Sequence, residues 1–236
     1  MPVVRFLPCI ALKVNSDIYL LDPGESCQAR MFRSGLSPLK VKAIFITHSH
    51  GDHYLGLPGL LQSMTLSERS ELLVIAAPRS LREVLVSLFK TGFVYPGFRV
   101  ELRDMTTDII YTDSKITVKS FPVDHSVEAY GLHVTIGKKT VCYTGDTAPC
   151  SSVVENCKGV DVLIHEATFT SIHSEEAHRQ KHSTALDAAE AALKAGAKLL
   201  VLFHISARHG DEEIFIDAYR VFKNTIVATD KLVLAL

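Results

Sequence analysis

The sequence has few cysteines, and their number and spacing suit neither a set of disulfide bonds nor a thiolate metal site. Its 236 residues include five cysteines, an odd number, and no two of them form a CxxC pair. This pattern argues against a disulfide framework and against a zinc site built from thiolates. We therefore expect reduced cysteines and a cytoplasmic location.

Long apolar runs, an export signal and net charge are also missing. No run approaches the roughly 20 apolar residues that a helix needs to cross a bilayer. The opening MPVVRFLPCIALKV lacks the basic start and the small-residue cleavage site of a secretory leader, which predicts a soluble, unexported protein. The formal net charge of -1 gives no global attraction for a polyanion, so nucleic-acid contacts would need local basic residues.

Apolar runs rich in β-branched residues recur along the whole chain and predict a sheet-based fold. The predicted strands are IALKV (10–14), DIYLLD (17–22), VKAIFITH (41–48), LLVIAAP (72–78), KITVKSF (115–121), YGLHVTI (130–136), KTVCYTGD (139–146), VDVLIHEAT (160–168), KLLVLFHIS (198–206) and TIVATDKLVLAL (225–236). No repeat, low-complexity stretch or linker interrupts them. Residues 1–236 are therefore expected to form one layered α/β domain.

Two amphipathic segments predict helices between these strands. In SLREVLVSLFKTG (80–92), the leading serine is expected to cap the helix, with Glu83 completing a capping box. In HSTALDAAEAALKAG (182–196), Ser183 or Thr184 has the same expected role. Both segments stop at a glycine, as helices commonly do.

Three histidines and an aspartate are packed into THSHGDH (47–53), directly behind the apolar run VKAIFI (41–46). The carboxyl ends of strands are where open α/β sheets collect ligands. Imidazole and carboxylate groups this close together are costly to bury unless a divalent cation offsets the charge and holds the histidines neutral. The motif therefore favours a metal site over a solvated loop. The expected ligands are His48 and His50 for one ion, and Asp52 and His53 for a neighbouring one.

One such cluster cannot complete the shells of two ions, so further ligands should come from later strand ends. The candidates are His125 in DHS, Asp146 in TGD and His204 in FHIS, each of which follows an apolar strand. A single histidine after a strand is more often an ordinary polar residue than a ligand. Three such strand ends in a chain that also carries HxHxDH favour metal binding.

These motifs resemble those of the metallo-β-lactamase superfamily and, within it, the tRNA 3′-processing endonucleases called tRNase Z or ribonuclease Z. HxHxDH alone is typical of the whole superfamily. HGDH followed by GLPGLL (56–61), with HEAT (165–168) and HST (182–184), is far more specific to tRNase Z, and the resemblance covers nearly the whole chain. It implies an α/β fold that is a four-layer αβ/βα sandwich, two zinc ions per chain, a cytoplasmic homodimer, and precursor tRNA as the substrate.

The resemblance also implies a role for each candidate ligand. Carried over to matching positions, His48, His50 and His125 would hold one zinc, Asp52, His53 and His204 the other, and Asp146 would bridge the two. Asp22 would support a metal-binding histidine through a hydrogen bond. Asp52 is implied as a catalytic residue as well. Because a metal-bound carboxylate is a weak base, we expect Asp52 to orient the attacking hydroxide rather than to remove a proton. Two divalent ions suit phosphodiester hydrolysis.

The leaving RNA fragment needs a proton that no metal ligand can supply. The resemblance implies His182 of HST as the donor, with Glu166 of HEAT stabilising the imidazolium and fixing its tautomer. Alternatively, HST only starts a helix and His182 is exposed. His165 lies within an apolar strand and is expected to be structural or to support a ligand. Ordinary surface or core roles are expected for His133, His173, His178 and His209.

Two parts of the family pattern are missing from this chain. Members usually begin with an LGTG turn and a PxKxRN loop, whereas MPVVRFLPCIALKV starts almost at the next strand. Where long-form and bacterial-type members insert a flexible tRNA-binding arm, YGLHVTI (130–136) continues through GKK into TVCYTGD as a plain hairpin. The sequence therefore predicts a short form whose hold on RNA depends on local basic residues.

Those basic residues are equally typical of a solvated surface. They are Arg30, Arg33, Lys40, Lys42, Lys138, Lys139 and Arg208. Two alternatives to the tRNA-processing interpretation therefore stay open. One is a hydrolase of the same fold that acts on a small phosphodiester or another ester. The other is a non-catalytic metal- or RNA-binding module.

Overall fold

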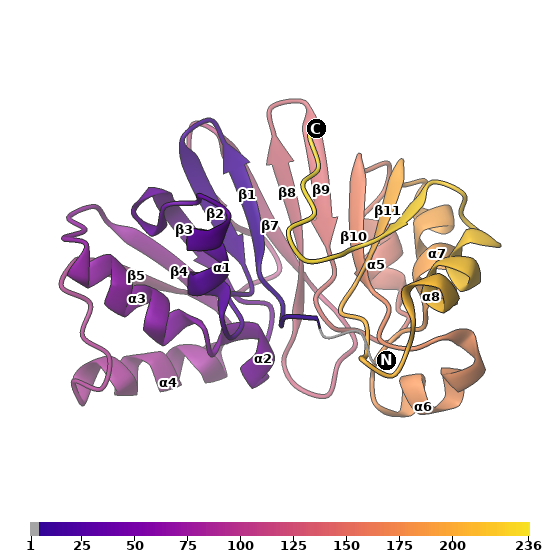
Figure 1. The fold of residues 1–236 in the computed structure, drawn as a ribbon, viewed down its shortest axis with the longest axis horizontal. Coiled ribbons are helices and arrows are strands. Elements are labelled where there is room, and N and C mark those ends of the chain that lie inside the picture. The colour runs from indigo at the N-terminus through magenta and orange to yellow at the C-terminus, as the bar shows by residue number, and fades with distance from the viewer. Residues whose placement is uncertain (1–4) are drawn as a thin grey trace. The chain divides into compact units, whose positions relative to one another are not determined.

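The computed structural model describes residues 5–236 (Figure 1). The first four residues, part of the segment in which the sequence departs from the family's N-terminal pattern, lie outside this range. The described chain forms two compact units. The N-terminal unit is Phe6–Met105, and the C-terminal unit is Arg5 with Thr106–Leu236. The expectation of a single domain stays a prediction. No helix in residues 5–236 is long and apolar enough to span a bilayer.

The N-terminal unit is built on a five-stranded sheet in the order β1-β2-β3-β4-β5. The strands are β1 (Ile10–Val14), β2 (Asp17–Leu21), β3 (Val41–Phe45), β4 (Leu73–Ala77) and β5 (Val100–Asp104). β1 is antiparallel to β2, and β2 to β5 are parallel. The helices are α1 (Cys27–Arg33), η1 (Pro38–Lys40), α2 (Gly51–Tyr54), α3 (Leu57–Leu66) and α4 (Arg79–Lys90).

Helices α1, α3 and α4 pack on one face of this sheet (Figure 1). Alternate residues of the strands point to that face, because side chains of a strand alternate between its two sides. The core joins Ile18, Leu20, Ile44, Leu73 and Ile75 of the strands to Leu57, Leu60, Leu61 and Met64 of α3 and to Leu81 and Leu85 of α4. This packing holds the strands, and the residues that follow their carboxyl ends, in place.

The C-terminal unit is built on a seven-stranded sheet in the order β12-β11-β10-β9-β8-β7-β6. The strands are β6 (Ile109–Thr112), β7 (Ile116–Pro122), β8 (Tyr130–Ile136), β9 (Lys139–Tyr143), β10 (Val162–Glu166), β11 (Leu199–Phe203) and β12 (Thr225–Val227). β6 to β9 are antiparallel neighbours, whereas β9 to β12 are parallel. The helices are α5 (Ser151–Asn156), η2 (Ser171–His173), α6 (Ser174–Arg179), α7 (Ala185–Ala195) and α8 (Asp211–Tyr219).

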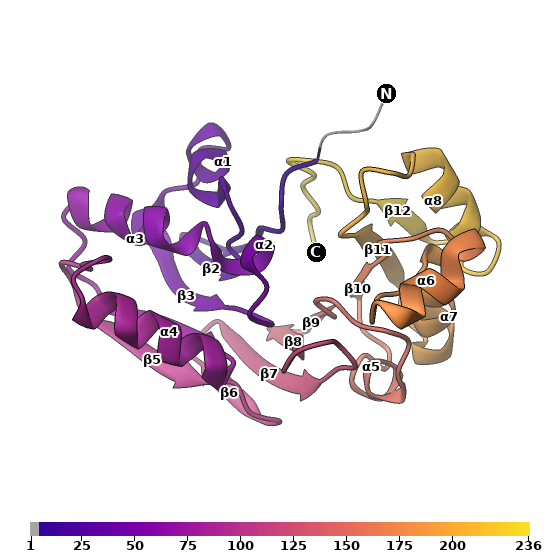
Figure 2. The same cartoon turned by 90° about the horizontal axis from the view of Figure 1, so that it is seen from below.

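Helices α5, α7 and α8 cover one face of this second sheet (Figure 2). The buried face of α7 consists of alanines, whose small side chains let the helix approach the strands closely. These are Ala185, Ala188, Ala189, Ala192 and Ala195. They pack with Leu163, Leu200 and Leu202 of the sheet. The start of α7 is thereby held beside the carboxyl ends of β10 and β11.

Most of the predicted strands and helices are present, and the errors in predicting strands occur at the edges of the two sheets. The missed strands β5 and β6 lie at sheet edges and carry charged or exposed residues, as edge strands often do. The last predicted strand is wrong beyond Val227. Among residues 5–236, β12 pairs with β11 alone, and this pairing ends where Val227 lies opposite Leu202. The predicted hairpin is confirmed: Ile136 pairs with Lys139, so β8 and β9 are joined by a two-residue turn.

The two predicted helices differ in how they begin. α4 starts at Arg79, and Arg82 donates its backbone N–H to Pro78, so Ser80 lies inside the helix and does not cap it. The Thr184 alternative is confirmed for α7, where its side chain and that of Asp187 form a capping box. Gly196 ends α7 in the left-handed conformation.

The prediction about the cysteines is wrong. Disulfides join Cys9 to Cys27 and Cys142 to Cys157, with Cα–Cα distances of 5.6 and 5.7 Å, and Cys150 is the free thiol. The partners are 18 and 15 residues apart in sequence, so no local spacing motif marks them. Pairing depends on Cα atoms that the fold brings within bonding range. The cysteines therefore give no support for a reducing compartment.

Candidate active site

The motif THSHGDH lies in the N-terminal unit immediately after β3. The strand ends at Phe45, and His50 occupies the N-cap position of the short helix α2. This turn brings the histidine rings together: the His48 centroid lies 4.1 Å from that of His53 and 4.8 Å from that of His50. His48 and His53 are fully buried, whereas His50 and Asp52 are half-buried.

Asp22 organises this cluster from the end of the neighbouring strand β2. Its carboxylate accepts hydrogen bonds from the Thr47 backbone N–H and hydroxyl, both at 2.7 Å, and lies 2.8 Å from His53 Nδ1. The Thr47 hydroxyl lies 3.0 Å from His48 Nδ1. Because β2 and β3 are parallel, their carboxyl ends meet at one edge of the sheet and bring Asp22 to the motif. Thr47 is a supporting residue that no sequence motif predicted.

The C-terminal unit collects its candidate residues at one edge of its sheet. β7, β9, β10 and β11 all run in the same direction, because β8 is antiparallel to both β7 and β9. Their carboxyl ends deliver His125, Asp146, Glu166 and His204. Ligand atoms of His125, Asp146 and His182 lie within 4.8 Å of one another, and His204 Nε2 lies 3.4 Å from an Asp146 carboxylate oxygen.

Two histidines of this unit are oriented through the ring nitrogen Nδ1. His125 Nδ1 lies 2.8 Å from the Lys181 carbonyl, and His204 Nδ1 lies 3.0 Å from the Thr168 hydroxyl. His48 and His53 of the N-terminal unit are held through Nδ1 in the same manner. Metal-ligating histidines almost always bond a carboxylate, carbonyl or similar group through the second ring nitrogen. The nitrogen that would coordinate a metal in all four is Nε2.

His182 and Glu166 form a nearly enclosed pair. His182 Nδ1 lies 2.9 Å from Glu166 Oε1, and the side chains are 16% and 1% exposed. Glu166 also accepts hydrogen bonds from the backbone N–H groups of Thr147 and Ser183 and from the Thr168 hydroxyl. The HST segment therefore starts α7 and also holds His182 in place, so the alternative of an exposed His182 is wrong.

The surroundings of His182 favour its charged form. Burial by itself lowers the pKa of His182, but the hydrogen bond to Glu166 and the negative charges of Glu166 and Asp146 outweigh burial and raise the pKa above its ordinary value. An imidazole with a raised pKa retains its proton at neutral pH more fully than a free histidine does. The contact with Glu166 and the charge of Asp146 therefore favour the protonated form of His182.

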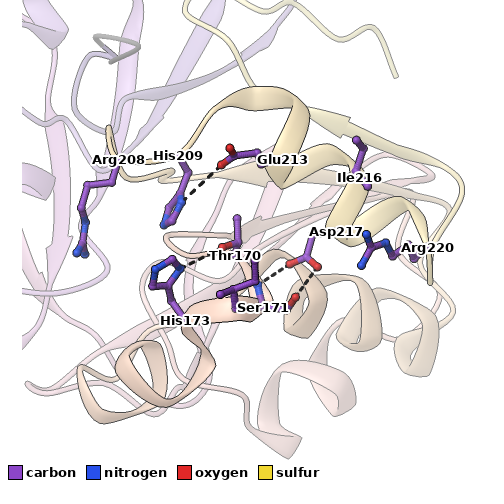
Figure 3. Close-up of a pocket in the computed structure, with 10 residues that line it drawn as sticks. Thr170, Ser171, His173, Arg208, His209, Glu213, Ile216, Asp217 and Arg220 are labelled. Carbon is purple, nitrogen blue, oxygen red and sulfur yellow. Dashed lines mark hydrogen bonds and ion pairs between the residues drawn. The ribbon is translucent and has the colours of Figure 1, made fainter. Parts of the chain in front are cut away.

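The other histidines have different environments. His165 is buried in β10, its Nδ1 lies 2.8 Å from the Glu166 carbonyl, and burial lowers its pKa, so it is a neutral structural residue. His133 contacts the Asn156 carbonyl, and His178 pairs with Asp187. His173 and His209 line a cavity of the C-terminal unit that no sequence motif predicts (Figure 3).

Comparisons with known proteins identify relatives along nearly the whole chain. A family model described as a beta-lactamase superfamily domain matches residues 18–205. Ribonuclease Z of Ignicoccus hospitalis is 35% identical, covering 96% of this chain and 91% of the relative. Ribonuclease Z of Sulfurisphaera tokodaii is 36% identical, with coverage of 96% and 92%. The alignment with the Ignicoccus relative spans 273 positions, which is more than the 236 residues of this chain. The relative therefore has internal residues that this chain lacks.

Solved structures agree with the sequence relatives. The short form of human tRNase Z matches with a TM-score of 0.83 and 27% identity, covering 97% of this chain and 92% of that one. A diphosphatase from the PhnP family matches with a TM-score of 0.78 and 25% identity, covering 98% and 85%. These findings confirm the predicted metallo-β-lactamase fold. The chain belongs to the ribonuclease Z family of the beta-lactamase superfamily.

Proposed function

We propose that this chain is an endoribonuclease that removes the 3′ trailer of precursor tRNA with the help of bound metal ions. Membership in the ribonuclease Z family places it among the tRNA-processing endoribonucleases. The observation that carries the proposal is the nearly enclosed His182–Glu166 pair, at 2.9 Å, beside Asp146 and His204. A proton donor next to a set of metal-ligand side chains is what hydrolysis of an RNA phosphodiester requires.

We propose zinc as the metal and two ions per chain. One ion would be held by His48, His50 and His125, the other by Asp52, His53 and His204, with Asp146 between them. The donor set fits such ions, since imidazole nitrogens and carboxylates are the ligands of catalytic zinc. The Nδ1 contacts of His48, His53, His125 and His204 support the assignment. Bound divalent ions lower the pKa of water and neutralise charge on a phosphate.

The remaining catalytic roles would belong to side chains of the protein. Asp52 would orient the attacking water. His182 bonds Glu166 through Nδ1, so its Nε2 would carry the proton that goes to the leaving oxygen of the cleaved phosphodiester. Glu166 stabilises the imidazolium and, through its contacts with Thr147 and Ser183, keeps the ring in one orientation. Loss of a positioned general acid typically costs about 10²–10⁴-fold in rate.

We also propose a cytoplasmic homodimer, in keeping with the substrate class and the family resemblance. Sedimentation of the purified protein would test the assembly, because a chain of 26.0 kDa and its dimer are readily distinguished. A monomer that cleaves precursor tRNA at full rate would contradict a functional dimer.

A second candidate function is hydrolysis of a small phosphodiester. Two observations favour it. The hairpin between β8 and β9 leaves no place there for a tRNA-binding arm. The structural match to a diphosphatase from the PhnP family supports it as well, since that protein is named for the hydrolysis of a diphosphate and not of RNA.

One experiment separates the two functions. Metal-loaded protein would be incubated with a 3′-extended precursor tRNA and, in parallel, with a chromogenic bis-aryl phosphodiester. We expect cleavage of the precursor on the 3′ side of the discriminator base, together with slower, unspecific diesterase activity. Brisk hydrolysis of the diester while precursor tRNA stays intact at low salt and high enzyme concentration would replace the tRNA function by the small-substrate alternative.

A further inference from the structure

Thr168, the threonine of HEAT, lies just after β10 and beside the residues that follow β11. The Ala167 N–H donates to the Phe203 carbonyl at 2.8 Å, and the Ser206 N–H donates to the Thr168 carbonyl at 3.3 Å. These hydrogen bonds continue the parallel pairing of β10 with β11. The backbone therefore places Thr168, whose side chain is half-buried, next to His204.

The Thr168 hydroxyl contacts two of the candidate site residues at once. It lies 2.7 Å from Glu166 Oε2, 3.0 Å from His204 Nδ1 and 3.0 Å from the His204 carbonyl oxygen. The other carboxylate oxygen of Glu166, Oε1, lies 2.9 Å from His182 Nδ1. The hydroxyl is 3.4 Å from that same His182 nitrogen, which is its longest contact of the four. One hydroxyl and one carboxylate therefore connect His204 to His182.

The chemistry of these partners fixes the direction of the hydrogen bonds. A hydroxyl has one hydrogen to donate and accepts through its lone pairs. Carboxylate and carbonyl oxygens only accept, and the shortest contact is the one to the Glu166 carboxylate. The hydroxyl therefore donates to Glu166, and its oxygen accepts from His204 Nδ1–H. With a proton on Nδ1, a neutral imidazole presents the lone pair of Nε2, which is the form that binds a metal.

The backbone of His204 also needs support. Its φ of 52° lies in the left-handed region, which a residue with a Cβ adopts at a cost in free energy. Such a conformation persists only where the surrounding contacts hold it. The Thr168 hydroxyl contacts both the ring and the carbonyl of His204, so it restrains the side chain and the backbone together. Loss of the hydroxyl would release both.

We propose that Thr168 is a positioning residue that couples metal binding at His204 to the carboxylate of Glu166. Its hydroxyl holds the proton of His204 on Nδ1, and Glu166 completes the chain of hydrogen bonds by accepting from the hydroxyl. Glu166 thereby supports a metal ligand through Oε2 as well as His182 through Oε1. This role of Thr168 rests on the metal site proposed above and adds a positioning residue to it.

The metal affinity of matched variants tests this role. Thr168→Val removes the hydroxyl and keeps the shape of the side chain, whereas Thr168→Ser keeps the hydroxyl. Competition with a chelator should show the ion assigned to His204 bound about 10- to 100-fold more weakly in the valine variant, as is typical when the partner of a metal-ligating histidine is lost. The serine variant should bind like the wild type. Thr170→Val is the control and should also bind normally, because its hydroxyl contacts His173, which is not a proposed ligand.

A double-mutant cycle tests the connection to Glu166. We expect Glu166→Gln to weaken metal binding about tenfold in the wild-type background, because the hydroxyl loses its carboxylate acceptor. The same change should add little in Thr168→Val, where the chain of hydrogen bonds is already broken. His182→Ala changes a residue beyond Glu166 and should leave the metal affinity unchanged. Additive losses in the double variant would overturn the coupling between Thr168 and Glu166.

NMR of the metal-free protein distinguishes failure of this role from failure of the metal site. The Nδ1–H proton of His204, assigned by its absence in His204→Ala, should be protected from exchange with water in the wild type and in Thr168→Ser, and unprotected in Thr168→Val. A wild type that binds no metal after reconstitution would refute the proposed metal site, and this signal would still decide the role of Thr168. It also decides the case in which Thr168→Val fails to fold. An unprotected Nδ1–H in the wild type, or equal metal affinities of the wild type and Thr168→Val, would overturn the proposal.

Discussion

His182 Nδ1 lies 2.9 Å from Glu166 Oε1, and this contact decides what the imidazole can do. The bond orients the ring through Nδ1 and favours the protonated form. Glu166 is itself held by three backbone N–H groups and the Thr168 hydroxyl. The pair therefore has the geometry that the proposed general acid requires and differs from a solvent-exposed ion pair.

Replacement of His182 separates acid chemistry from metal binding. We expect His182→Ala to keep the metal content of the wild type and to reduce turnover of precursor tRNA by about 10²–10⁴-fold. The defect should be much smaller with a nitrophenolate leaving group, which hardly needs a proton. His178→Ala, in an exposed histidine paired with Asp187, is the control and should be fully active. An equal loss with good and poor leaving groups would assign His182 to substrate positioning.

The pH profile should report the raised pKa of His182. A general acid works in its protonated form, so kcat/KM falls as pH rises through its pKa, and a raised pKa moves this fall to higher pH. Glu166→Gln removes the negative charge that favours the imidazolium. We therefore expect the alkaline fall in kcat/KM to move to lower pH in this variant, measured with a diester that has a poor leaving group. An unchanged alkaline limb would show that another group controls it.

Metal binding should depend on Asp22, although Asp22 is not among the proposed ligands. Elemental analysis should find close to two zinc ions per chain in the wild type. Asp22→Asn weakens the anchor of His53 and Thr47, and such supporting contacts typically contribute about 10- to 100-fold in metal affinity. Competition with a chelator would measure the change. Asp230→Asn, in an exposed coil, should bind metal normally, and a metal-free wild type after reconstitution would contradict the site.

The disulfide Cys142–Cys157 should stabilise the C-terminal unit. It closes a loop of 15 residues between β9 and the end of α5, for which chain-entropy arguments give roughly 3 kcal/mol of unfolding free energy. We expect Cys142→Ala with Cys157→Ala to lower the denaturant midpoint of the oxidised protein and to leave that of the reduced protein nearly unchanged. Thiol titration of the oxidised wild type should find one reactive cysteine, Cys150. Five titratable thiols in the native protein would contradict both disulfides.

The plain hairpin between β8 and β9 should weaken the hold on tRNA without impairing the chemistry. Contacts remote from the reacting phosphate bind the ground state and the transition state alike, so their absence raises KM far more than it lowers kcat. Compared with an arm-bearing ribonuclease Z, we expect a higher KM, a similar kcat and a steep loss of binding with salt. A low KM that hardly responds to salt would show that other surfaces replace the arm.

The sequence alone was sufficient for features that depend on neighbours in the chain. THSHGDH directly follows an apolar strand, and the HST segment directly precedes a helix with Thr184 as its cap. Polar residues at the ends of the predicted strands indicated where the candidate ligands would lie, because parallel strands have their carboxyl ends at the same edge of a sheet. The resemblance of HGDH, HEAT and HST to tRNase Z motifs predicted the metallo-β-lactamase fold.

Only the tertiary structure decided the features that depend on residues far apart in the chain. It joined Cys9 to Cys27 and Cys142 to Cys157, because disulfides follow Cα geometry and not spacing motifs. It brought the Thr168 hydroxyl to His204, a contact across 36 residues that no local pattern records. It also buried His209 beside His173 in a cavity, since burial is set by the packing of α8 against a loop and not by the identity of a histidine.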